Sequence, residues 1–160
     1  MRVVSNTGPL IALAKIRRLD LLSSIYSEVI VPRAVMRELT KGSDWLQIPP
    51  LETRPSFRVA DWRIPPDPLL TAQLDEGEAA VIRIAMEIGD AEVLIDEKKA
   101  RRIAAAVYQL KVLGTGGLLL RAKEKKLVVA IKPLLQEIRT NGYYISDRLQ
   151  NGILRAAGEG

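Results

Sequence analysis

Four side chains that carry oxygen donors are far apart in the sequence but occupy comparable positions in it: Asn6, Glu38, Glu78 and Asp96. Asn6 and Asp96 each directly follow a short apolar run, whereas Glu38 and Glu78 lie in segments with a helical pattern. In an open α/β sheet, ligands bind at the carboxyl ends of the strands. Oxygen donors from several such ends can therefore converge on one hard cation, such as Mg²⁺ or Mn²⁺.

Each of these side chains has a simpler explanation when it is taken alone. Asp96 has the residue type of a helix N-cap, and Asn6 is one of three neighbours able to cap a helix that begins near Pro9. Glu78 is in the first turn of a helix, where an acidic side chain complements the helix dipole. Glu38 has the pattern of a solvated helix surface. Their joint occurrence, together with the resemblance described below, favours a shared site.

Two further segments have the chemistry of phosphate contacts. The turn Gly114–Gly117 can direct backbone N–H groups at an anion, but it lacks the Lys-Ser/Thr ending of a P-loop. Arg101 and Arg102 follow Asp96 closely and can reach a phosphate, although arginines on helix surfaces are common. The glycine turn alone supports a distant alternative, a small α/β nucleotide-binding protein.

Short apolar strands and amphipathic helices alternate along the chain, and they must position the four side chains. Strands are expected at 3–5, 29–31, 93–95 and 112–113, with another within 48–60. Helices are expected at 9–16, 21–26, 32–40, 76–88, 98–109, from the glycine turn through 125, and twice within 133–157. Continuous apolar strands separated by helices favour a parallel sheet covered on both faces.

Residues 43–68 differ from the rest of the chain. Six prolines interrupt regular structure there, and both tryptophans, Trp45 and Trp62, lie in this segment. We interpret it as a surface excursion in preference to a binding loop. Pro55 predicts that a strand within 48–60 lies at the edge of the sheet, because proline cannot donate to a ladder.

Length and composition set limits on the class of protein. The 160 residues, 48% of them hydrophobic, fit a single globular domain spanning 1–160. With no cysteine and no histidine, the chain has no disulfide, no thiolate zinc site, no histidine-ligated metal and no Ser-His-Asp triad. Any acid–base or metal chemistry must therefore rest on carboxylates, hydroxyls, amides and lysine.

The charge and the apolar pattern indicate partners and location. A net charge of +5 is compatible with a phosphate-rich partner, although many basic proteins have none. Aromatic residues make up only 4%, which argues against a stacking platform for unpaired bases and favours contacts to a nucleic-acid backbone. No apolar run approaches the roughly 18–20 residues that span a bilayer, and no secretory pattern is evident. We expect a cytoplasmic protein with no membrane partner.

Four segments of the chain occur in an order typical of a known family. They are Val3–Ile11 (VVSNTGPLI), Val31–Leu39 (VPRAVMREL), Gly77–Ile82 (GEAAVI) and Leu94–Arg101 (LIDEKKAR). Together they resemble PIN-domain proteins, most closely the VapC-like prokaryotic branch. The resemblance extends from Met1 to about Leu127 and includes the turn at Gly114–Gly116.

The resemblance implies a three-layer α/β/α PIN-like domain with a central parallel sheet, completed or extended by the helices within 133–157. It also implies a ribonuclease that depends on Mg²⁺ or Mn²⁺, often the toxin of a toxin–antitoxin pair. RNA, an antitoxin protein and a second copy of the chain are the partners it implies. Carried over by position, the metal ligands are Asn6, Glu38, Glu78 and Asp96, and the last three are the catalytic carboxylates. Such carboxylates hold cations that activate a water and stabilise the phosphate undergoing attack.

The chain departs from the family pattern at Asn6, where the family normally carries Asp. An amide oxygen can ligate a hard cation but contributes no negative charge, so weaker metal binding is expected. Two functions therefore remain open. One is an active metal-dependent ribonuclease, and the other is a degenerate, non-catalytic PIN-fold protein that binds RNA or an antitoxin.

Overall fold

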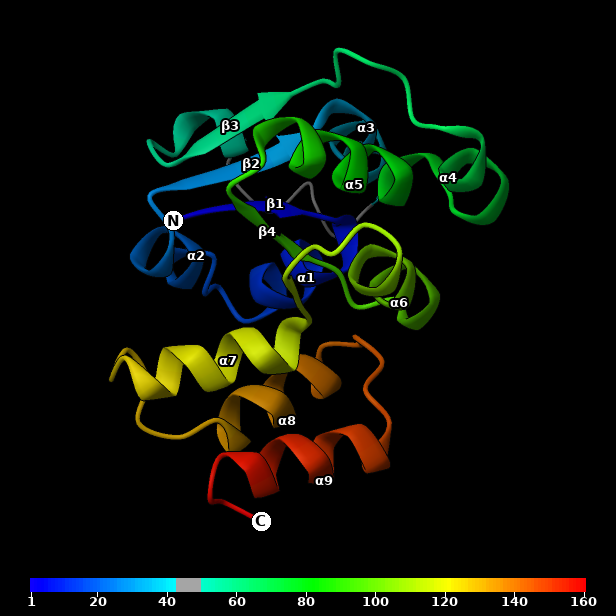
Figure 1. The fold of residues 1–160 in the computed structure, drawn as a ribbon. Coiled ribbons are helices and arrows are strands. Elements are labelled where there is room, and N and C mark those ends of the chain that lie inside the picture. The colour runs from blue at the N-terminus through cyan, green and yellow to red at the C-terminus, as the bar shows by residue number, and fades with distance from the viewer. Residues whose placement is uncertain (43–49) are drawn as a thin grey trace.

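The computed structural model describes residues 1–42 and 50–160, and its centre is a parallel sheet of five strands (Figure 1). The strands are β1 (Arg2–Ser5), β2 (Glu28–Pro32), β3 (Phe57–Ala60), β4 (Ala91–Leu94) and β5 (Val112–Leu113). Their order across the sheet is β3-β2-β1-β4-β5, and every neighbouring pair is parallel. The chain thus builds one half of the sheet outward from β1 and then returns to build the other half.

Helices connect the strands and cover the sheet. They are α1 (Thr7–Lys15), α2 (Asp20–Ile25), α3 (Arg33–Lys41), α4 (Pro68–Gln73), α5 (Glu76–Ile88), α6 (Lys98–Ala106), α7 (Thr115–Glu124), α8 (Lys132–Thr140) and α9 (Asp147–Ala156), with a short 3₁₀ turn at Leu51–Thr53. Helix α5 packs against β1, β2 and β4 on one side. On the other side lie α1 and α2, and α7, α8 and α9 continue beyond α1 (Figure 1). This arrangement is the expected three-layer α/β/α fold.

The central strands are apolar on both faces because helices cover both faces. Val3, Val4, Ile30 and Val93 are completely buried. The edge strand β3 is different, since only Phe57 of its four residues is buried. This confirms the edge position that the sequence predicts.

A hydrogen-bonded network of Glu92, Tyr26 and Arg121 lies toward the amino-terminal end of the sheet. Glu92, opposite Val3 in the β1–β4 register, is only 5% exposed. The Tyr26 hydroxyl donates to its Oε1 at 2.7 Å. Arg121 of α7 donates to Oε1 at 2.5 Å and to Oε2 at 3.3 Å. Both oxygens of this buried carboxylate therefore have donors.

Two helix predictions need correction, and one region cannot be compared. Helix α4, which is not among the helices expected from the sequence, begins at the last residue of the segment interpreted as a surface excursion; Asp67 caps it and Pro68 opens it, which is the favoured place for proline. Helix α6 ends at Ala106, three residues before the expected end, because Gln109 takes a left-handed backbone conformation (φ 55°) that stops the helix. Trp45 lies outside the described residues.

Among the described residues, no helix combines the length and the apolar character that crossing a membrane requires.

Candidate metal and active site

The strand order places a reversal point at β1, and two of the four oxygen-bearing residues flank it. The chain runs from β1 outward through β2 and β3, then crosses to β4 on the other side of β1. Asn6 directly follows β1, and its backbone N–H donates to the Leu94 carbonyl of β4 at 2.9 Å. Asp96 lies two residues beyond the end of β4. Open α/β sheets bind ligands in the crevice at such a point.

Asn6 is the N-cap of α1 by position, but its side chain does not cap the helix. Its Oδ1 is buried and has no hydrogen-bond partner among the described residues. Buried polar atoms normally have a partner, so an orphaned acceptor calls for an explanation such as a missing ion or water. The side chain of Asn6 therefore does not cap the helix in this structure.

Glu38 of α3 approaches Asn6 beside Gly77. The hydroxyl of Thr7 donates to Glu38 Oε2 at 3.0 Å, so this carboxylate is held although the residue is largely exposed. A Cβ placed at Gly77 would lie 3.3 Å from Glu38 Oε2 and 3.4 Å from Asn6 Oδ1. The amide oxygen and the carboxylate oxygen thus border the same space, and a side chain larger than glycine at position 77 would press on both.

Glu78 has the local role expected of an acid in a first helical turn, and it is also buried. With Asp75 it forms a capping box: Glu78 N–H donates to Asp75 at 2.8 Å, and Asp75 N–H donates to Glu78 Oε1 at 3.1 Å. Burial raises the pKa of the Glu78 carboxyl, and the nearby carboxylates of Asp75, Glu97 and Glu38 raise it further, against the lowering effect of the capping hydrogen bond. Negative charge is therefore disfavoured at Glu78, and a nearby cation would favour it.

Asp96 is fixed by donors from the C-terminal half of the chain. Its Oδ1 accepts from the Thr115 backbone N–H at 2.6 Å, and its Oδ2 accepts from the Thr115 hydroxyl at 2.6 Å and the Tyr143 hydroxyl at 2.5 Å. The N-cap of α6 is Glu97, so the capping explanation for Asp96 is wrong. Because Thr115 N–H is taken by Asp96, it is not directed at a nucleotide phosphate.

All four residues line one open cavity of about 400 Å³, with Asp75 and Glu97 also in its wall. Among the described residues, however, no group of three or more acidic, histidine or cysteine side chains is close enough together to hold a metal ion. Sequence reasoning therefore selected side chains that share a cavity. Their role as metal ligands stays a prediction.

The family model DUF3368, described as a PIN domain, matches residues 2–159. The chain belongs to the PIN-domain family. The PIN fold is generally a nuclease fold, and its members generally use divalent metals. Comparison with curated proteins and with solved structures gives no significant match.

Three residues of this PIN domain site were not among the sequence candidates. Thr7 and Thr115 each open a helix directly after or close to a strand end, so the same reasoning that selected Asn6 could have found them. Tyr143 has no comparable signal. It lies between α8 and α9 and reaches Asp96 only because the C-terminal helices fold back on α1 and α7.

Proposed function

We propose that this PIN domain is a metal-dependent endoribonuclease, with Mg²⁺ or Mn²⁺ bound by Asn6, Glu38, Glu78 and Asp96. The observation that supports this most directly is the buried Asn6 Oδ1, which lacks a hydrogen-bond partner among the described residues. Leaving a buried acceptor unsatisfied costs about 1–3 kcal/mol. A cation, or a water on a cation, is a partner that would remove this cost.

The donor set suits a hard cation even without a compact group of acids. Mg²⁺ usually keeps several waters and is held by one or two carboxylates together with substrate phosphates. Asn6 and Glu38, which border the same space at Gly77, are such a set, and Glu78 and Asp96 line the same cavity. When bound, the ion supplies an activated water and neutralises charge that develops on the phosphate.

The side chains of the protein contribute orientation. Thr7 holds Glu38, while Thr115 and Tyr143 hold Asp96, so these two carboxylates do not need to be immobilised when substrate arrives. Burial and the nearby Asp96 raise the pKa of the Tyr143 hydroxyl, which keeps it protonated and able to donate. Glu78, whose charged form is disfavoured in the metal-free protein, gains most from a cation.

Cleavage of RNA with Mn²⁺ tests the proposal. We expect cleavage by the natural chain, loss of cleavage with a chelator, and a decrease of at least about 100-fold for Asp96→Asn, since removal of one metal-holding carboxylate weakens transition-state stabilisation. The matched control is Asp90→Asn, because Asp90 is exposed and lies just before β4, at the opposite end of that strand. Equal activity in the natural chain, the chelated sample and Asp96→Asn would contradict the site.

A second candidate function is a non-catalytic PIN-fold protein that binds RNA or an antitoxin. It is favoured by the amide at position 6 and by the lack of a three-acid group among the described residues. Calorimetric titration with Mn²⁺ separates the two functions. Binding in the micromolar to millimolar range supports the nuclease, and no heat at millimolar Mn²⁺ supports the binding protein.

From the resemblance alone we further propose that the chain is the cytoplasmic toxin of a toxin–antitoxin pair and forms a homodimer. A small antitoxin-like reading frame directly upstream of the gene, whose product relieves toxicity on co-expression, would support the toxin role. Sedimentation equilibrium measures the oligomeric state, and a monomer at all concentrations would contradict the dimer.

A further inference from the structure

The hydrogen bonds that Asp96 accepts from the described residues are distributed unequally over its two oxygens. Oδ2 accepts from the Thr115 hydroxyl at 2.6 Å and from the Tyr143 hydroxyl at 2.5 Å. Oδ1 accepts from the Thr115 backbone N–H at 2.6 Å and from no other described donor. An ionised carboxylate has about four acceptor sites, two on each oxygen. Both sites of Oδ2 are therefore occupied, and the site that the described residues leave free is on Oδ1.

The structure provides both the proton and the space that the Tyr143 hydroxyl needs. Burial raises its pKa, and the nearby Asp96 raises it further, so the hydroxyl stays protonated and able to donate. A Cβ at Gly8 would lie 2.8 Å from the Tyr143 hydroxyl oxygen, closer than Cβ atoms approach other atoms in proteins, but 3.6 Å from Asp96 Oδ2, an ordinary contact. The glycine in the first turn of α1 therefore makes room for the Tyr143 hydroxyl and not for Asp96 itself.

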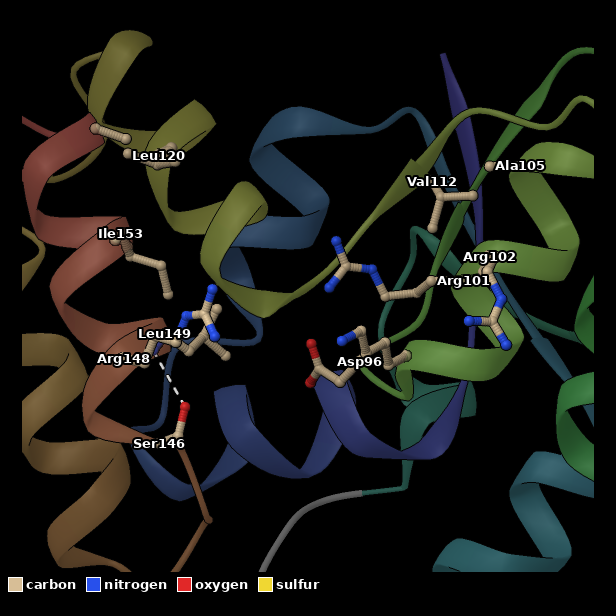
Figure 2. Close-up of a pocket in the computed structure, with 13 residues that line it drawn as sticks. Asp96, Arg101, Arg102, Ala105, Val112, Leu120, Ser146, Arg148, Leu149 and Ile153 are labelled. Carbon is tan, nitrogen blue, oxygen red and sulfur yellow. Dashed lines mark hydrogen bonds between the residues drawn. The ribbon is translucent and has the colours of Figure 1, made fainter.

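Tyr143 meets Asp96 at the wall of the candidate cation site. The cavity of about 400 Å³ is lined by Tyr143 as well as by the four candidate ligands. In Figure 2 the Asp96 carboxylate points away from α6 and toward the C-terminal segment that carries Ser146. A change at Tyr143 would thus alter the oxygens that Asp96 offers without altering any of the four oxygen-bearing side chains.

The number of oxygens that a carboxylate offers affects which cation it binds. Ca²⁺ takes about six to eight oxygen ligands and often binds a carboxylate through both oxygens. Mg²⁺ is smaller, demands near-octahedral geometry and keeps several waters, and Mn²⁺ also prefers six oxygen ligands. A carboxylate with one oxygen occupied by hydroxyl donors therefore disfavours Ca²⁺ more than it disfavours Mg²⁺ or Mn²⁺.

We propose that Tyr143 is a specificity-determining residue for the cation: it occupies Asp96 Oδ2, leaves Asp96 one oxygen for the ion, and thereby favours Mg²⁺ or Mn²⁺ over Ca²⁺. The inference rests on the proposed function, because it concerns the same site. Tyr143 acts through Asp96, so it is a positioning residue. Thr115 donates to both oxygens, whereas the Tyr143 hydroxyl donates to Oδ2 alone, so Tyr143 is the residue whose removal opens that oxygen selectively.

Calorimetric titration with Mn²⁺ and with Ca²⁺, in the absence of RNA, tests the proposal on the natural chain and on Tyr143→Phe. Phenylalanine retains the ring and removes the hydroxyl. We expect the ratio of the Ca²⁺ to the Mn²⁺ dissociation constant to fall on the order of tenfold in the variant, because Ca²⁺ gains a second oxygen of Asp96. The matched control is Tyr144→Phe, which removes the hydroxyl of the adjacent, 85% exposed tyrosine and should leave the ratio unchanged. Circular dichroism establishes that the variants are folded.

Gly8→Ala tests the same contact from α1. The added methyl group should displace the Tyr143 hydroxyl from Asp96, and alanine is a better helix former than glycine, so the fold should be retained. We expect the ratio of the two dissociation constants to fall, as it does in Tyr143→Phe. The double variant Gly8→Ala/Tyr143→Phe should have the ratio of Tyr143→Phe alone, because both changes act through one hydroxyl.

The outcomes separate the role of Tyr143 from the cation site itself. An unchanged ratio in Tyr143→Phe, including an equal change in affinity for both ions, would overturn the role of Tyr143 and leave the cation site in place. Effects of Gly8→Ala and Tyr143→Phe that add in full would overturn the role of Gly8 in making room for the hydroxyl. Failure of the proposed function would appear differently, as absence of heat with either ion at millimolar concentration in the natural chain, and would overturn both.

Discussion

The two ends of the β1–β4 pair each bury an acidic residue, but only one end neutralises it. At the amino end, Glu92 receives hydrogen bonds from Tyr26 and Arg121. At the carboxyl end, Glu78 lies among other carboxylates, and Asn6 Oδ1 has no partner among the described residues. A buried charge whose partners are all present is a structural element, whereas a cavity of oxygen donors without a counter-charge is a site that requires something from outside.

The largest effect on the free energy of unfolding is expected at the amino end of the β1–β4 pair, where Glu92 is neutralised. Glu92→Ala removes the partner of a partly buried guanidinium, and we expect it to lower the free energy of unfolding by about 3 kcal/mol. Urea denaturation measures this. The control is Glu28→Ala, which breaks the more exposed pair with Arg58 and should cost less than about 1 kcal/mol. Equal losses in the two variants would remove the distinction between a buried and an exposed pair.

The next effect concerns Asp96, which accepts from several donors at the carboxyl end. Tyr143→Phe removes the hydroxyl that donates to Asp96, and we expect the free energy of unfolding to fall by about 1.5–3 kcal/mol, the range for a hydrogen bond to a charged group. Thermal melts measure the change. Tyr144→Phe is the control, because the adjacent hydroxyl is on an exposed side chain and its loss should leave the melting temperature unchanged.

A smaller effect on stability should follow from adding a negative charge at the carboxyl end of the β1–β4 pair, where the described residues do not neutralise the acidic side chains. Asn6→Asp places a further carboxylate in a buried position near Glu38 and Glu78, so without metal the protein should lose about 1 kcal/mol of stability. With Mn²⁺ the sign should reverse, and metal affinity should rise on the order of tenfold because the charge of the ligand set increases. Melts with and without Mn²⁺ test this. A variant that is destabilised equally in both conditions would contradict a cation site at Asn6.

The smallest effect is a difference in pH dependence between the two buried glutamates. Burial raises the pKa of Glu92, but the hydrogen bonds from Arg121 and Tyr26 outweigh this and lower it below its ordinary value of 4.5, so its stabilising contribution is complete above that value and is lost as the pH falls through the folded-state pKa. The pKa of Glu78 is raised, so its ionisation opposes folding above the folded-state pKa, and this opposition disappears as the pH falls below 4.5.

Glutamine variants make this difference measurable. Above both folded-state pKa values, Glu92→Gln should destabilise the protein, whereas Glu78→Gln should stabilise it slightly, because glutamine also serves in a capping box. As the pH is lowered, the Glu78→Gln difference should disappear by about pH 4.5, whereas the Glu92→Gln difference should begin to shrink only below that value, when measured by urea unfolding at several pH values. Two variants with the same sign at pH 7 would contradict the contrast between the ends.

The sequence predicted much of the fold because its signals are local. Continuous apolar runs such as Val3-Val4 and Val29-Ile30-Val31 are typical of parallel strands covered on both faces, and α5 ends at Ile88 as expected. Helix α4 is not predicted because its proline-rich surroundings favour irregular structure, although Pro68 stands at the helix position that tolerates a proline.

For the candidate site too, local signals could be predicted from the sequence, whereas contacts between distant elements could not. Asn6 and Asp96 could be found from the strands before them, and the structure places them with Glu38 and Glu78 around one cavity. What could not be found is the set of partners that depends on the packing of distant elements. The Tyr143 contact with Asp96 joins residues 47 positions apart, and no local pattern encodes it.

The position of Tyr143 also links the site to the docking of the C-terminal helices. Tyr143 lies between α8 and α9, and these helices pack on α1 and α7. Local opening of α8 and α9 would withdraw the hydroxyl that donates to Asp96 while the sheet stays folded. Under the proposed function, the local stability of the C-terminal helices therefore sets the fraction of molecules whose site is complete.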